Sequence, residues 1–131
     1  MVGCEPKSLA AHTDRLAMVI DLEHHEEICI LRIKGRLAPA TDLDYLSSKA
    51  AEIDAMRCTK LLGDFHEVAA IGSMGVGFVV SVYNSVNKLP GGRFVLAGVN
   101  KRVRRVLELT RVSTIIPMVE DLDAGLNALR G

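Results

Sequence analysis

The chain of 131 residues has no tryptophan, and aromatic residues make up only 4% of it. Its core must therefore be built mostly from aliphatic side chains, which are plentiful because hydrophobic residues account for 49% of the sequence. Net charge is also lacking, since 16 basic and 16 acidic residues cancel. General electrostatic attraction to nucleic acid or to an anionic membrane needs a basic surplus, so neither is an expected partner.

Cysteine is scarce as well. Cys4, Cys29 and Cys58 are odd in number and have no CxxC spacing, so they predict neither a disulfide framework nor a zinc site. Cys29 and Cys58 fall at apolar strand and helix-end positions, where they are interpreted as small core residues. The longest strongly apolar stretch, around residues 74–83, is about half of a membrane span. We therefore expect a cytoplasmic protein without direct membrane insertion.

Signatures of catalysis are missing too. The sequence has no GxGxxG after a strand, no GxxxxGK[ST] phosphate loop and no GxSxG nucleophile turn. His24 and His25 are adjacent in an expected polar turn, so they cannot form the i, i+4 ligand pair of a metal-binding helix. The expectation is a protein that is not an enzyme, with no catalytic residue, no metal and no cofactor.

What the sequence does contain is an alternation of strands and helices. Residues 1–16 are expected to form a loose extension and residues 17–131 a single domain. The expected elements are strands at 18–22 and 28–34 with Gly35 ending their hairpin, a helix at 42–57 opened by a capping box from Thr41 to Asp44, a strand at 60–65, a helix at 73–89, a strand at 93–98, a helix at 101–110, an extended piece at 115–118 and a helix at 122–129. This order predicts an α/β fold, with a mixed four- to five-stranded sheet, an N-terminal antiparallel hairpin and four or so flanking helices.

The segment from Leu61 to Phe78 carries the most information about function. Ser73 lies at the expected N-cap of the helix at 73–89, and capping alone is the simplest interpretation of this serine. Gly75 and Gly77 weaken that interpretation, because each costs about 0.5–1 kcal/mol relative to alanine within a helix. Glycines at this cost suggest that something approaches the backbone there.

The same helix is apolar over an unusually wide arc. A helical wheel gives an inward stripe, and further apolar residues extend that stripe on one side. The stripe is Val76, Val79, Val80, Tyr83 and Val86; the extension is Met74, Phe78 and Val82; the remaining polar strip is Gly77, Ser81, Asn84 and Lys88. The extension is either additional core or the edge at which a partner docks.

A basic run opens the helix at 101–110, with Lys101, Arg102, Arg104 and Arg105 in sequence and Arg111 beyond them. Positive charge at a helix N-terminus opposes the helix dipole, so an acidic partner or a phosphate is one interpretation. The other is a solvated face on which Arg104 pairs with Glu108 at i, i+4.

Taken in order, these pieces resemble the STAS domain, and within it the stand-alone bacterial anti-sigma factor antagonists. The resemblance covers roughly Val19 to Leu129. The matching pieces are the strand at 28–37, Thr41 at the start of the first helix, Asp64-Phe65, the segment from Ile71 to Gly77, the segment from Gly91 to Leu96, the helix from Val103 to Thr110 and the closing segment from Glu120 to Ala124. The basic run belongs to this pattern, which favours the solvated-face interpretation.

The resemblance implies a mechanism. Antagonists of this kind bind an anti-sigma factor that is also a serine kinase, and so release the sigma factor. Phosphorylation of a serine at the start of the second helix breaks the complex, and a phosphatase restores it. Ser73 matches that serine, and the residues implied in partner binding are Thr41, Gly72, Met74, Gly75, Gly77, Phe78 and Ser81.

Two positions depart from the family pattern. The family motif Asp-Ser-Ser/Thr-Gly is replaced by Gly72-Ser73-Met74-Gly75, and a second family acid falls on Ala38. Such acids orient the serine or help to take up its proton. The alternative hypothesis is therefore a non-switching STAS module, acting as a signalling scaffold or as an accessory subunit of a membrane transporter. The oligomeric state, including a homodimer, stays open.

Overall fold

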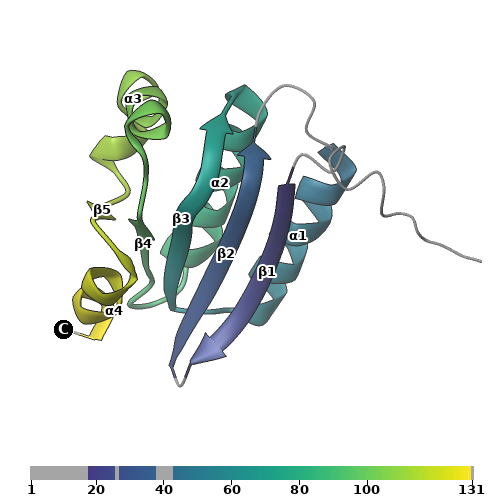
Figure 1. The fold of residues 1–131 in the computed structure, drawn as a ribbon. Helices are drawn as coiled ribbons and strands as arrows, with labels where there is room; N and C mark the ends of the chain where they lie inside the picture. Colours follow the sequence, from purple (N-terminus) through teal and green to yellow (C-terminus); the bar gives the residue numbers. More distant parts are fainter. Residues whose placement is uncertain (1–17, 26, 38–42, 131) are drawn as a thin grey trace, which may run out of the picture.

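The computed structural model describes residues 18–25, 27–37 and 43–130, and the expected loose extension at 1–16 lies outside them. Strands and helices alternate along the described chain (Figure 1). The elements are β1 (Met18–His25), β2 (Ile28–Leu37), α1 (Leu43–Met56), β3 (Lys60–Ile71), α2 (Ser73–Asn87), β4 (Arg93–Ala97), α3 (Lys101–Leu109), a 3-10 turn (Val112–Thr114), β5 (Met118–Val119) and α4 (Leu122–Arg130).

The strands form one five-stranded sheet in the order β1-β2-β3-β4-β5. β1 and β2 are antiparallel, whereas each later strand runs parallel to the one before it. Parallel neighbours need a crossover connection, and α1, α2 and α3 supply the three crossovers. The expected fold class, a mixed sheet that begins with an antiparallel hairpin and is flanked by four helices, is confirmed.

The two faces of the sheet are covered by different helices. Helices α1, α2 and α3 pack on one face over the main core, which contains Cys29, Leu31 and Ile33 of β2. Helix α4 packs on the opposite face, over a smaller core that includes Ile30 of β2 (Figure 1). The alternation of β2 side chains between the two clusters is the period-two pattern of a strand buried on both faces.

Helix α4 lies close to the sheet because of Gly125. A Cβ atom at this position would come within 2.4 Å of Leu62 Cδ1 on β3. Such a distance is well inside van der Waals contact, so any larger residue at this position would require the buried Leu62 side chain to shift. Among the described residues, no helix has both the length and the apolar character needed to cross a bilayer.

Several expected boundaries are wrong because the strands run further. β1 extends to His25, so His24 and His25 are strand residues and do not form a turn. Gly35 does not end the hairpin: it adopts φ 103° inside β2, where the pairing with β3 shifts register. β3 continues to Ile71, because Val68 and Ile71 still point into the core and pair with the end of β2.

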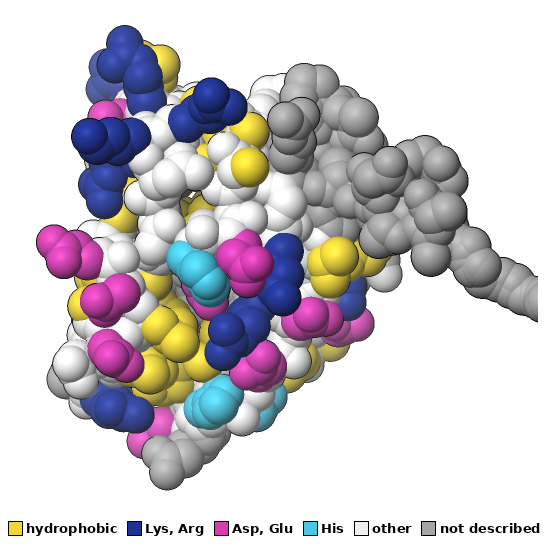
Figure 2. All heavy atoms as spheres, in the orientation of Figure 1, with side chains coloured by type: hydrophobic (Ala, Val, Ile, Leu, Met, Phe, Trp, Pro, Cys, Tyr) yellow, Lys and Arg dark blue, Asp and Glu magenta, His cyan; other side chains and the backbone are white. Residues whose placement is uncertain are grey.

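The part of the sheet that α4 leaves open carries a network of charged side chains. The buried carboxylate of Asp64 accepts a hydrogen bond from Arg32 Nη1 at 3.2 Å and lies 2.7 Å from His66 Nδ1. Arg32 Nε in turn donates a hydrogen bond to Glu23 at 2.7 Å. Hydrogen bonds from His25 and Arg32 lower the pKa of the Glu23 carboxyl. Figure 2 shows this face, with histidine, acidic and basic side chains gathered over the strands. The network compensates the buried charge of Asp64 and so stabilises the sheet.

Candidate partner-docking groove

A shallow apolar groove runs between α1 and α2, which lie side by side on the same face of the sheet (Figure 1). It encloses about 250 Å³. Its lining residues are Leu46, Ser47 and Ala50 from α1 and Met74, Gly77, Phe78 and Ser81 from α2. Small side chains on both helices keep the groove open, and larger apolar side chains form its floor.

The α1 side of the groove follows from the helical spacing of its residues. Leu46 and Ile53 are buried in the main core, while Ala50 lies between them at the edge of that core. Ser47 is exposed and completes the rim. Ala50 follows Leu46 by four residues and Ser47 by three, so its side chain neighbours both of them on the surface of α1.

The α2 side is rotated from the expected orientation. Phe78 and Val82, expected as an apolar extension, are 5% and 1% exposed and belong to the core. Val76 and Val80, expected to point inward, are only half-buried. The reason is that α2 packs against both the sheet and α1, so its buried face turns toward α1. Of the apolar extension, Met74 alone is exposed, at 40%.

Ser73 is the first residue of α2, and its side chain is exposed. The expectation that Ser73 caps the helix is wrong. Gly72 is the N-cap, in an extended conformation without a side-chain cap, and its carbonyl accepts the first helical hydrogen bond from Val76 N–H at 2.9 Å. A residue at the first helical position lacks the geometry by which an N-cap side chain reaches the second or third N–H. The Ser73 hydroxyl is therefore not used as a cap.

The beginning of α2 suits an anion. The N–H groups of Ser73, Met74 and Gly75 precede the first helical hydrogen bond, so they have no acceptor within the helix. The first turn holds no acidic residue. The helix dipole and these N–H groups together stabilise a negative group placed there.

The expected site residues divide into two groups. Met74, Gly77, Phe78 and Ser81 line the groove. Gly72, Ser73 and Gly75 lie at the adjoining N-terminal end of α2, where Gly75 is buried. Thr41 lies outside the described residues.

Sequence reasoning missed the α1 contribution to this groove. Leu46 and Ala50 lie four residues apart, which is helical spacing, but that spacing does not reveal that α1 packs beside α2. Beyond the groove lining, an ion pair between Asp54 Oδ1 and Lys88 Nζ at 2.8 Å joins the C-terminal parts of α1 and α2. Hydrogen bonds from Lys88 and Ser85 lower the pKa of the Asp54 carboxyl.

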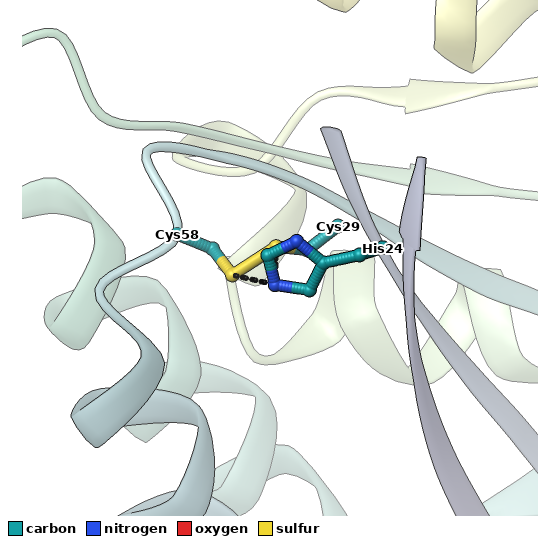
Figure 3. The surroundings of a disulfide bond; sticks show 3 residues. All are labelled: His24, Cys29 and Cys58. Carbon is teal, nitrogen blue, oxygen red and sulfur yellow. Dashed lines mark hydrogen bonds between the residues drawn. A yellow bond between two sulfur atoms is a disulfide. The ribbon is translucent and has the colours of Figure 1, made fainter. Parts of the chain in front are cut away.

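A second correction concerns the cysteines. Cys29 and Cys58 are joined in a disulfide, with their Cα atoms 6.2 Å apart, although the sequence predicted no disulfide. His24, expected to be a solvated turn residue, lies beside both sulfur atoms (Figure 3). These three residues come from β1, β2 and the loop after α1, so only the folded topology brings them together.

Comparison with known proteins agrees with the topology. The family model described as "STAS domain" matches residues 19–125. The chain belongs to the STAS domain family. The match covers nearly the whole sheet, the groove between α1 and α2, and the beginning of α4.

Relatives of this STAS domain include regulators of sigma factors. An anti-sigma F factor antagonist of Paenibacillus polymyxa is 24% identical over 102 residues, which cover 78% of this chain and 86% of that protein. An anti-sigma factor antagonist from Mycobacterium paratuberculosis has a crystal structure with a TM-score of 0.75 and 22% identity, covering 87% of this chain and 95% of that one. The unphosphorylated form of the anti-sigma factor antagonist SpoIIAA, named in another structure as a Bacillus cell-fate determinant, has a TM-score of 0.72 and 21% identity, covering 86% and 97% of the two chains. At these identities the two structures show a shared fold.

Proposed function

We propose that this STAS domain is an anti-sigma factor antagonist that binds an anti-sigma factor through the groove between α1 and α2 and the adjoining start of α2. The relatives with this function support the proposal. The observation that carries it is the exposed Ser73 at the first position of α2, next to Met74, which lines the groove. An apolar groove with a modifiable residue at its end suits a regulated interface.

The proposed partner is an anti-sigma factor with serine kinase activity, and the proposed phosphoacceptor is Ser73. A phosphate there carries roughly 1.5–2 negative charges, which the free N–H groups of α2 stabilise. The fold is therefore retained on phosphorylation. The same charge stands one residue from Met74, where docking removes water, so binding of the partner weakens through desolvation and repulsion. A phosphatase that removes the phosphate returns the protein to its binding form.

Gly72 argues against phosphorylation of Ser73. The family motif places an acid at this position, and the first turn of α2 has no acidic side chain to orient the Ser73 hydroxyl. This observation favours the second candidate function, a non-switching STAS module in a signalling scaffold or beside a membrane transporter. In that case the groove still docks a protein, but Ser73 is not modified.

A kinase reaction distinguishes the two functions. The full chain is incubated with ATP, Mg²⁺ and an anti-sigma factor kinase from the same genome, and the product is mapped by mass spectrometry. We expect one phosphate on Ser73, none on the Ser73→Ala variant and faster modification of Gly72→Asp. Tight binding without any phosphate on wild type or on Gly72→Asp contradicts the switch and leaves the scaffold. No binding of the anti-sigma factor by the unmodified chain contradicts the antagonist function.

A further inference from the structure

His24, Cys29 and Cys58 converge on one point at the edge of the main core. His24 Nε2 lies 3.4 Å from Cys29 Sγ and 4.0 Å from Cys58 Sγ. Figure 3 shows the imidazole of His24 lying against the two bonded sulfur atoms. The cysteines are buried, at 2% and 6% exposure, while His24 is exposed. One imidazole nitrogen and two sulfur atoms thus face a common centre that solvent reaches from one side.

The backbone holds these three residues firmly. His24 and Cys29 are direct partners across the antiparallel β1–β2 ladder, so their side chains leave the sheet on the same face. Cys58 follows Arg57, whose left-handed φ of 51° comes directly after the end of α1. Two residues after Cys58, Lys60 begins β3 and pairs with Ile28 of β2. The sheet register fixes His24 and Cys29 relative to each other before any metal arrives, so these two ligands lose little conformational freedom on binding.

We propose that, with the disulfide reduced, His24, Cys29 and Cys58 bind a zinc-type divalent cation. Two thiolates and one imidazole are a donor set that Zn²⁺ prefers, and sites with three protein ligands keep a fourth position for water. The exposed side of His24 leaves room for that fourth ligand. The Cα separation of 6.2 Å between the cysteines allows both sulfur atoms to reach one metal at about 2.3 Å. This site is separate from the docking groove and does not rest on the proposed function.

The disulfide and the metal site are alternative states of the same residues. A dithiol or phosphine reductant supplies two electrons, the S–S bond breaks, and two protons complete the thiols. Metal binding then releases those two protons, because the thiolate is the ligand. Neutral His24 supplies its Nε2 lone pair, and the oxidation state of the zinc does not change. The oxidised chain offers no thiolate, so it does not bind the metal.

The test uses the full chain carrying Cys4→Ser, which leaves Cys29 and Cys58 as the two cysteines of the chain. The protein is reduced with a phosphine until two free thiols are counted, and is then titrated with Co²⁺ as a spectroscopic substitute and with Zn²⁺ in competition. Further variants are His24→Ala, Cys29→Ser and Cys58→Ser. His25→Ala is the matched control, since His25 is the neighbouring histidine and contacts Glu23 instead.

We expect about one tetrahedral Co²⁺ per chain with thiolate-to-metal charge-transfer absorption, displaced by Zn²⁺. Zn²⁺ should raise the melting temperature of the reduced chain and of His25→Ala. Losing a residue that only hydrogen-bonds to a metal ligand costs roughly 10–100-fold in metal affinity, and we expect His24→Ala to weaken metal binding at least as much. The cysteine variants should lose the charge-transfer band.

Four results would overturn the proposal. The first is a reduced chain that shows neither the charge-transfer absorption nor the rise in melting temperature. The second is metal binding by the cysteine variants, or by the oxidised chain, that equals binding by the reduced chain, and the third is equal loss of metal affinity in His24→Ala and His25→Ala. The fourth is a disulfide that cannot be reduced in the folded chain. The last would mean that the site never forms.

Discussion

Asp54 of α1 and Lys88, directly after α2, join the ends of the two groove helices through an ion pair of 2.8 Å. Hydrogen bonds from Lys88 and Ser85 lower the pKa of Asp54 below its ordinary value of 3.8. A carboxyl whose pKa is lowered by folding stabilises the protein above its unfolded pKa, and this contribution is lost as the pH falls through the lowered value.

The first prediction follows from this pair. Asp54→Asn should be less stable than wild type by a constant amount above the unfolded pKa of about 3.8, and the difference should shrink at lower pH. Urea unfolding at a series of pH values measures it. Asp21→Asn, at an exposed position on β1, is the control for charge alone. A difference between wild type and Asp54→Asn that does not change with pH would contradict the account.

Gly77 permits a second prediction, because stability and binding should move in opposite directions. A Cβ at Gly77 meets no atom within 4 Å, so Gly77→Ala is accommodated. It should stabilise the chain by about 0.5–1 kcal/mol through helix propensity. The added methyl lies in the groove, so affinity for a docked partner should fall.

Asn84→Ala is the matched control for Gly77→Ala. Asn84 is exposed on α2 and does not line the groove, so its replacement should raise helix propensity without affecting the partner. Denaturant midpoints and binding isotherms are measured for both variants. Equal affinities for Gly77→Ala and wild type would show that the partner does not enter the groove at this point.

Gly125 supports a third prediction of opposite sign. Gly125→Ala gains helix propensity, but its Cβ would meet Leu62 Cδ1 at 2.4 Å. Overpacking of this kind costs about 1–3 kcal/mol, so we expect a net loss of stability. Asn127→Ala, exposed on the same helix, should not lose stability. A Gly125→Ala variant at least as stable as wild type would mean that α4 does not press on β3.

The sequence predicted the order of elements well, because amphipathic patterns and glycine stops are local signals. It failed where pairing decides the outcome. The sequence predicts a strand that ends at Phe65, because the polar pair His66 and Glu67 interrupts its apolar run. Pairing with β2 carries β3 to Ile71 instead. The orientation of α2 was also missed, because its arc is apolar over more than one face and only packing against α1 selects which part is buried.

Sites assembled from distant segments could not be predicted from spacing. The Cys29–Cys58 disulfide and its neighbour His24 depend on where the loop after α1 meets the sheet. The sequence predicts Ser73 as the N-cap of α2, because a serine before a helical pattern is a common cap. Gly72 takes that role through its extended backbone.

A fourth prediction follows from Gly72, not Ser73, being the N-cap of α2. Ser73→Ala removes no capping hydrogen bond, so the free energy of unfolding should change by no more than about 0.5 kcal/mol. Ser73→Asp should be equally or slightly more stable, by about 0.3–1 kcal/mol, because a carboxylate near a helix N-terminus interacts favourably with the dipole. Thermal and urea unfolding of the three proteins measure this. A loss of 1 kcal/mol or more in Ser73→Ala would restore the capping role.

In the proposed switch, a negative charge at Ser73 releases the partner without unfolding the STAS domain. The most direct measurement compares the affinity of wild type, Ser73→Ala, Ser73→Asp and Ser48→Asp for the anti-sigma factor by titration calorimetry. Ser48 is the control, as an exposed serine on α1 outside the groove lining. We expect Ser73→Asp alone to lose affinity, by at least roughly tenfold or about 1.4 kcal/mol, while remaining folded. Equal affinity of Ser73→Asp and wild type would contradict it.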